Sequence, residues 1–406
     1  MNELRNGHIT SPSGFLASAI ACGLKNSRDL DLTLLLSEND CCGAGVFTCN
    51  RLPAAPVILD KETLEANPTR LRGIVANAGI ANACTGSAGL EAARASQQLA
   101  AIALHCAPEA ILVLSTGVIG VPLDMRKISS GIQSAAKNLS PENGLDAARA
   151  IMTTDTQPKH AAYCLPFSEG TVTIGGIAKG AGMIHPNMAT MLAVLTTDAL
   201  LQSDKLQELL QEAVDETFNC ISVDGDTSTN DTVLLLANGA SGVSVQTEER
   251  LRIFAHALKE LCRTLAHAII RDGEGASKFI TIEVAEAGRE AEARSVAQTI
   301  ATSPLVKTAF AGGNPNWGRI LAAAGRAGVE LDPARIKLWI GSRDGKELQL
   351  VDNGSPLTYD QAQAEAIFCA PEFTVRLSLG MGNTSITYWT CDLTHEYVSI
   401  NADYRT

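Results

Sequence analysis

The sequence has few of the features that mark nucleic-acid-binding proteins. Aromatic residues make up only 4% of its 406 residues, so it lacks the ring-rich surface on which bases stack. Acidic side chains outnumber basic ones by 44 to 32, and the resulting net charge of −12 repels phosphate backbones. We therefore expect no nucleic-acid partner.

No uninterrupted apolar run reaches the length of a membrane span. The uncharged stretch between Lys179 and Asp198 is long enough, but glycine, histidine, proline and asparagine interrupt it. The shorter apolar run at 14–24 has its small residues inside it rather than after it, unlike a signal peptide, and predicts a buried strand or helix. We expect a cytoplasmic protein that binds no membrane.

The eleven cysteines lack the spacing of a disulfide framework or a metal site. No C-x-x-C pair occurs, and the seven histidines form no ligand cluster. We expect reduced thiols and no bound metal. The P-loop, the G-x-S-x-G elbow and the H-E-x-x-H motif are also absent, which removes three familiar kinds of chemistry.

Strand-like and helix-like segments alternate along the chain, as is typical of an α/β protein whose helices cover its sheets. Apolar residues recur at helical spacing after Thr247, and this pattern predicts a helix that ends near Gly273. Other helices are predicted over 90–105 and from Ser140 and Ser203. The predicted strands are 111–114, 171–177, 231–236, 279–285, 336–340, 373–379 and 385–392.

One segment, 179–192, combines features that are unusual for a core strand. Its glycines let the backbone approach another group closely, and Pro186 rigidifies the turn that follows. Two interpretations stay open from these residues: a buried turn in which Thr190 packs by its methyl group, or a site of self-cleavage. A cut between Ala189 and Thr190 would give Thr190 a free α-amine, which can serve as the base for its own hydroxyl.

At this segment the chain resembles the ornithine acetyltransferase family of arginine biosynthesis, the glutamate N-acetyltransferases. The resemblance covers essentially the whole chain, and its strongest block is KGAGMI at 179–184 followed by PNMATML at 186–192. Supporting blocks are NACTG at 82–86, STGVIG at 115–120, DGDTSTND at 224–231, GEGASK at 273–278, SPLVKT at 303–308, PNWGRI at 315–320 and NADYRT at 401–406. Departures from the family pattern at 77–82 and at Asn314 leave the Thr190 position unchanged.

The resemblance implies a fold and a division of the chain. The implied fold is α/β (α+β): a four-layer αββα sandwich formed across two self-cleaved chains, with a smaller α/β domain at about 280–406. Cleavage at Ala189-Thr190 would give an α chain, 1–189, and a β chain, 190–406, that stay associated. Family members assemble as α2β2 heterotetramers, so the same assembly is expected here.

The resemblance also implies a ping-pong acetyl transfer with Thr190 as the nucleophile. Thr190 takes an acetyl group from N-acetylornithine and passes it to glutamate, while Thr116 and Gly117 stabilise the oxyanion through a hydroxyl and a backbone N–H. The implied substrate-binding set is Thr153, Lys179, Thr190, Glu274, Asn401 and Thr406. No metal or prosthetic group is implied, and we expect acetyl-CoA to serve as a second acetyl donor, as it does in some members.

Without the resemblance, the same residues have ordinary interpretations. Ser115-Thr116-Gly117 would be a strand-ending turn, Lys179 a solvated loop lysine, Glu274 a surface carboxylate and Asn401 a turn residue. A self-cleaving aminopeptidase of related four-layer architecture, which passes the acyl group to water, is the alternative enzyme. A metal-binding or thiol-redox module is a remote alternative that rests only on the cysteine count.

Overall fold

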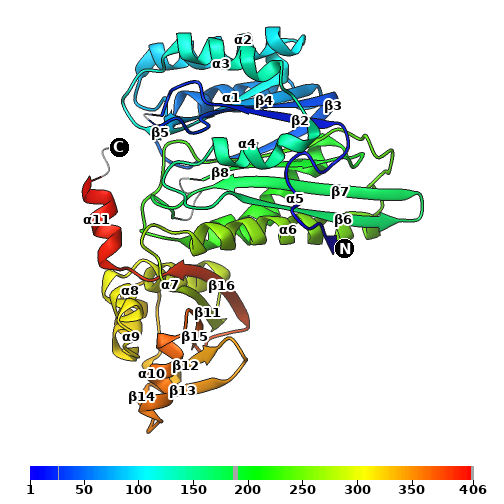
Figure 1. Cartoon of the computed structure of the whole chain (residues 1–406). Coiled ribbons are helices and arrows are strands. Elements are labelled where there is room, and N and C mark those ends of the chain that lie inside the picture. Colours follow the sequence, from blue (N-terminus) through cyan, green and yellow to red (C-terminus); the bar gives the residue numbers. More distant parts are fainter. Residues whose placement is uncertain (26, 186–190, 404–406) are drawn as a thin grey trace. The chain divides into compact units, whose positions relative to one another are not determined.

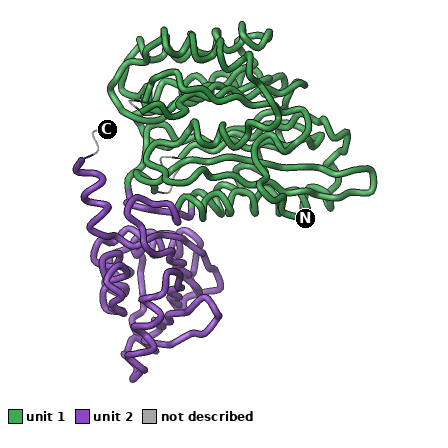
Figure 2. Tube along the Cα trace, viewed as in Figure 1, with its two compact units in different colours: residues 1–219, 226–269, 406 green, residues 220–225, 270–405 purple. Residues whose placement is uncertain are grey.

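The computed structural model describes residues 1–25, 27–185 and 191–403, which form two compact units (Figure 1, Figure 2). Of the described residues, those within 1–219 and 226–269 form unit 1, and those within 220–225 and 270–403 form unit 2. None of the helices in these residues combines the length and the apolar character that crossing a membrane requires.

Unit 1 is built on a mixed sheet, to which the described residues contribute nine strands in the order β1-β6-β7-β8-β10-β3-β4-β5, with β2 paired to β3. The long strand β3 joins two halves of this sheet, because its residues 32–36 and Cys41 pair with β4 and its residues 42–47 pair with β10. The strand bounds are β1 (Asn2–Glu3), β2 (Phe15–Ile20), β3 (Leu32–Phe47), β4 (Leu71–Ile80), β5 (Ile111–Val118), β6 (Lys159–Phe167), β7 (Gly170–Lys179), β8 (Leu192–Thr197) and β10 (Thr232–Ala237).

The two faces of each half pack into different cores because successive side chains on a strand point to opposite faces. In β5, Leu112 and Leu114 join the core between the two halves, whereas Ile111 and Val113 join the core under α1, α2 and α3. Helix α4 lies between the halves, and Figure 1 shows α5 and α6 on the far side of β6–β8. The helix bounds are α1 (Ala55–Ala66), α2 (Gly86–Leu104), α3 (Met125–Ala136), α4 (Gly144–Ala150), α5 (Ser203–Asp215) and α6 (Glu248–Arg271).

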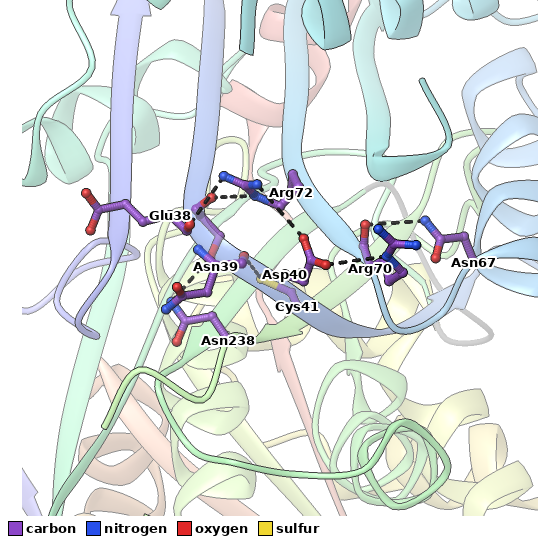
Figure 3. Close-up of polar contacts among 9 residues, drawn as sticks. Glu38, Asn39, Asp40, Cys41, Asn67, Arg70, Arg72 and Asn238 are labelled. Atoms are coloured by element: carbon purple, nitrogen blue, oxygen red, sulfur yellow. Dashed lines mark hydrogen bonds and ion pairs between the residues drawn. The ribbon is translucent and has the colours of Figure 1, made fainter. Parts of the chain in front are cut away.

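Charged side chains gather where β3 changes partner. The pairing of β3 with β4 shifts register between Leu36 and Cys41, and Asp40 lies in that irregular stretch. Figure 3 shows Asp40 between Arg70 and Arg72, with the Asp40 carboxylate 3.4 Å from Arg70 Nε and 3.9 Å from Arg72 Nη1. We call Asp40, Arg70 and Arg72 the exposed cluster.

Unit 2 contains a second mixed sheet, with the described strands in the order β14-β13-β12-β15-β11-β16-β9. Phe310, Phe368 and Phe373 pack against one another in its core with ring centroids 4.8–5.8 Å apart, and Phe368 and Phe373 are stacked. Its strands are β9 (Ile221–Ser222), β11 (Phe279–Ala287), β12 (Lys337–Ser342), β13 (Glu347–Asp352), β14 (Ser355–Pro356), β15 (Glu372–Ser378) and β16 (Thr384–Cys391). Its helices are α7 (Glu290–Ala301), α8 (Pro304–Ala311), α9 (Trp317–Gly325), α10 (Gln361–Cys369) and α11 (His395–Asp403).

The structure confirms the coarse prediction of an α/β protein, and both sheets are mixed. The helix predicted after Thr247 is α6, and the apolar run at 14–24 contains a strand, β2. The helix start predicted at Ser140 is a short 3-10 turn, Pro141–Asn143, before α4 begins at Gly144. The Ser140 side chain accepts a hydrogen bond from the Glu142 N–H, which is the capping contact that the sequence pattern predicts.

Candidate active site

Thr116 and Gly117 lie in β5, where the backbones of β4 and β5 come unusually close. Gly117 has φ +129°, and a Cβ atom there would lie 2.3 Å from the Gly79 carbonyl carbon, so no side chain fits. Thr116 is buried, and its hydroxyl makes no hydrogen bond to any residue that the structure describes. The interpretation of this segment as a strand-ending turn is wrong, because Ser115, Thr116 and Gly117 all pair with β4.

Two buried amides hold these strand ends in place. The Asn230 amide donates to the carbonyls of Ala81 (2.7 Å) and Ser115 (2.8 Å), which joins the end of β4 to β5. The Ser115 hydroxyl donates to Asn77 Oδ1 at 2.7 Å. Because the amides satisfy buried polar groups on both strands, the backbone around Thr116 and Gly117 is rigid.

Asp231, the residue after Asn230, holds the start of β8. Its Oδ1 accepts the Met191 N–H at 2.9 Å, and the parallel pairing of β8 with β10 begins beside it at Leu192 and Thr232. Burial raises the pKa of Asp231 well above its usual range, although the Met191 N–H and the Lys179 charge oppose this effect. The Met191 nitrogen belongs to the peptide bond with Thr190, so Asp231 fixes the chain immediately after the predicted nucleophile.

Lys179 and Thr153 meet at the end of β7. Lys179 is buried, and its Nζ donates to the Thr153 hydroxyl oxygen at 2.7 Å. Lys179 faces Leu192 across the antiparallel pairing of β7 with β8. The interpretation of Lys179 as a solvated loop lysine is therefore wrong, and a buried ammonium at a strand end is suited to an anionic ligand.

Asp155, which lies in no motif of the sequence, connects these groups. Its carboxylate accepts hydrogen bonds from the N–H groups of Thr153 (3.0 Å) and Gly180 (2.6 Å) and from Lys159 Nζ (2.7 Å), and it lies 3.9 Å from Lys179 Nζ. Burial alone would raise the pKa of Asp155, but Lys179, Lys159 and the Gly180 N–H outweigh it and hold the pKa at about 2. We call Asp155, Lys159 and Lys179 the buried cluster.

Three of the predicted residues lie outside the described part of the chain. These are Ala189 and Thr190, at the predicted cleavage site, and Thr406, in the predicted substrate-binding set. The described structure resumes at Met191 and ends at Asp403.

Unit 2 brings together two other members of the predicted substrate-binding set. The Asn401 amide donates to Glu274 Oε2 at 2.8 Å and to the Tyr397 carbonyl at 3.0 Å. Asn401 lies in helix α11, so its interpretation as a turn residue is wrong. Gly275, with φ +66°, allows this contact, because a Cβ there would lie 2.5 Å from the Tyr397 nitrogen.

The described residues therefore form three local groups: Thr116 with Gly117, Thr153 with Lys179, and Glu274 with Asn401.

Comparison with known proteins gives the family to which such a chain belongs. The model of the ArgJ family matches residues 16–406. The chain belongs to the ArgJ family. This membership confirms the resemblance that the sequence blocks indicate.

The relatives of this ArgJ-family chain are similar along their whole length. The arginine biosynthesis bifunctional protein ArgJ of Symbiobacterium thermophilum is 48% identical, and the alignment covers 98% of this chain and 99% of that protein. The protein of the same name from Caldanaerobacter subterraneus is 44% identical over 100% of both chains. A crystal structure of Mycobacterium tuberculosis ornithine acetyltransferase, complexed with ornithine, is 40% identical and covers 46% of this chain and 97% of its own, with a TM-score of 0.43.

Proposed function

We propose that this chain is an acetyltransferase of arginine biosynthesis that moves an acetyl group from N-acetylornithine to glutamate. The observation that carries the proposal is membership of the ArgJ family over residues 16–406. Relatives aligned over their whole length are named as bifunctional arginine-biosynthesis proteins, and another relative is named as an ornithine acetyltransferase. The aminopeptidase and the metal or thiol module have no such support.

The first proposed step is self-cleavage between Ala189 and Thr190. The Thr190 hydroxyl oxygen attacks the Ala189 carbonyl carbon, the C–N bond breaks, and the nitrogen gains the proton to become the Thr190 α-amine. Water then hydrolyses the ester, which leaves a free carboxylate at Ala189 and a free hydroxyl at Thr190. The contact of Asp231 with the Met191 N–H supports this step, because it fixes one flank of the scissile bond.

The second proposed step is acetyl transfer through acetyl-Thr190. The Thr190 α-amine accepts the hydroxyl proton, the oxygen attacks the acetyl carbon of N-acetylornithine, and the amide C–N bond breaks as ornithine leaves with the proton. The glutamate amine then attacks the ester carbon, the bond to the Thr190 oxygen breaks, the amine's proton passes to that oxygen, and N-acetylglutamate leaves. One nucleophile therefore serves two substrates that are both amino acids.

Both half-reactions develop negative charge on the acetyl oxygen. We assign its stabilisation to the Thr116 hydroxyl and the Gly117 N–H, because the hydroxyl is uncommitted among the described residues and the backbone there is rigid. Donors that are fixed before the reaction gain energy without having to reorganise.

The substrate α-carboxylate is assigned to Lys179, with Thr153 beside it, because Lys179 is a buried cation whose Nζ is held at 2.7 Å from the Thr153 hydroxyl. Glu274 and Asn401 are assigned to substrate binding, with the Glu274 carboxylate suited to an ammonium group. Thr406 completes the proposed set.

We also propose the four-layer αββα arrangement across the α chain 1–189 and the β chain 190–406, the smaller domain at about 280–406, and an α2β2 assembly.

A denaturing mass measurement on the purified protein tests the cleavage. We expect two chains that separate between Ala189 and Thr190, and acetyl transfer from N-acetylornithine to glutamate by the cleaved protein. Thr190→Ala should remain uncut and transfer nothing. Thr197→Ala, which removes a buried threonine hydroxyl from β8, is the control and should be cut and active.

An intact chain that transfers acetyl would overturn the Thr190 mechanism. Release of the acetyl group to water at an equal rate with and without glutamate would favour the aminopeptidase. A separate assay with acetyl-CoA and glutamate tests the second activity, and we expect N-acetylglutamate to form.

A further inference from the structure

Asp155 is buried at a point where two groups assigned to the substrate meet. Its side chain is 0% exposed, and it contacts both the Thr153 N–H, at 3.0 Å, and the Lys179 ammonium, at 3.9 Å. Asp155 is therefore a shared neighbour of the two groups.

The contacts of Asp155 also fix the backbone on both sides of the site. One oxygen accepts the Gly180 N–H, which directly follows Lys179, and the other accepts the Thr153 N–H. Thr153 and Gly180 are 27 residues apart in the chain, so the carboxylate ties the loop after α4 to the end of β7. Such contacts hold the Lys179 side chain and the Thr153 hydroxyl at the ends of two anchored segments.

The negative charge of Asp155 also contributes to the arrangement of the two neighbouring lysines. Lys159 and Lys179 are both buried, and a nearby anion offsets part of the cost of removing their charges from water. Asp155 supplies that anion to both lysines, because Lys159 Nζ lies 2.7 Å from its other oxygen. Loss of the carboxylate charge would leave two neighbouring cations to repel each other.

From these contacts we infer that Asp155 is a positioning residue for substrate binding: it fixes Lys179 and Thr153 in the arrangement that binds the substrate carboxylate. This inference rests on the proposed function. Asp155 itself need not touch substrate, and its effect passes through Lys179 and Thr153. A positioning role of this kind acts on the binding of both amino-acid substrates and leaves the chemistry at Thr190 alone.

Asp155→Asn tests the inference, because asparagine keeps the size of the side chain and removes its charge. We expect the KM values for N-acetylornithine and for glutamate both to rise by about tenfold or more, while kcat changes by less than about threefold. Asp155→Glu, which restores the charge, should recover part of the lost affinity. Asp40→Asn makes the same charge change in the exposed cluster and is the matched control, with unchanged KM values.

A second variant covers the case in which Asp155→Asn fails to fold. The double variant Asp155→Asn with Lys159→Met removes one buried anion and one buried cation together. If Asp155 positions Lys179, the KM values of the folded double variant stay raised. Wild-type KM values in that variant, or in Asp155→Asn itself, would overturn the inference, as would a fall in kcat with unchanged KM.

The outcome also separates this inference from the proposed function. Absence of acetyl transfer by wild type and by Asp40→Asn alike would refute the proposed function. Normal transfer by wild type together with unchanged KM values in Asp155→Asn would refute only the role of Asp155.

Discussion

Unit 1 contains two clusters with the same charges and opposite surroundings. The exposed cluster places Asp40 between Arg70 and Arg72 (Figure 3), and the buried cluster places Asp155 between Lys159 and Lys179. The Asp40 and Arg70 side chains are 49% and 78% exposed, whereas Asp155 and Lys159 are 0% and 1% exposed. Water screens the charges of Asp40 and Arg70 more strongly than those of Asp155 and Lys159, so the ion pairs of the buried cluster constrain their side chains more.

The largest expected difference is in stability. Asp155→Ala leaves two buried ammonium groups without this carboxylate, and we expect a loss of about 3–5 kcal/mol in the free energy of unfolding. Asp40→Ala should cost less than about 1 kcal/mol. Urea unfolding of both variants beside wild type measures the difference, and equal losses would contradict the contrast between the clusters.

The next largest expected effect is on the rate of acetyl transfer, and it comes from an uncharged group. Thr116→Val removes an uncharged hydroxyl from a buried strand, and we expect acetyl transfer to slow by roughly 100- to 1000-fold if that hydroxyl stabilises the oxyanion. Thr33→Val is the control, because Thr33 is a buried strand threonine whose hydroxyl donates to the Ser18 carbonyl. Steady-state rates of the two variants, each checked for cleavage, decide the assignment. A rate for Thr116→Val close to that of Thr33→Val would remove Thr116 from the oxyanion site.

A smaller effect should appear when stability is measured at different pH values. The pKa of Asp155 is lowered from 3.8 to about 2, so its contribution to stability is complete above about pH 4 and is lost as pH falls toward 2. The shift corresponds to roughly 2 kcal/mol. The stability difference between wild type and Asp155→Asn should therefore shrink by about that amount between pH 5 and pH 2. Urea unfolding across this range measures it, and a constant difference would show that Asp155 does not carry the charge described above.

The smallest expected effect concerns salt. A double-mutant cycle on Asp40 and Arg70 should give a coupling energy below about 1 kcal/mol, and about 1 M NaCl should remove most of it. The corresponding cycle on Asp155 and Lys159 should keep most of its coupling in the same salt, because solvent ions do not reach a buried pair. An equal loss of coupling energy in salt would show that solvent ions reach both clusters.

Local patterns in the sequence were enough to predict many of the elements. Helix α6 keeps a regular apolar spacing, and β5 is a short apolar run between turn residues, so both could be predicted without knowledge of their neighbours. Strand β3 was not predicted, because Gly43, Gly45 and the charged stretch around Asp40 hide its alternation. The coarse α/β class follows from such local patterns, whereas the strand order depends on contacts between distant segments.

The roles of Asp155 and Asp231 could not be predicted for the same reason. Lys159 and Lys179 become neighbours only because the β6–β7 hairpin pairs Lys159 with Ala178, and Asp155 then lies beside both. Asp231 reaches Met191 only because β10 lies next to β8. A usable indication was present in the hairpin: two lysines at paired ends of its strands require a nearby anion if both are buried.

The strand order in unit 1 bears on what a cut after residue 189 would do to the molecule. Strands β7 and β3 precede that point in the chain, β8 and β10 follow it, and the sheet places them in the order β7-β8-β10-β3. The two fragments would thus be interleaved within one sheet, and pulling them apart would break the β7–β8 and β10–β3 ladders at once. Unfolding of the cleaved protein would then release two molecules instead of one. The midpoint of reassembly from the separated fragments would therefore depend on protein concentration, whereas that of an uncut chain with the same sheet would not.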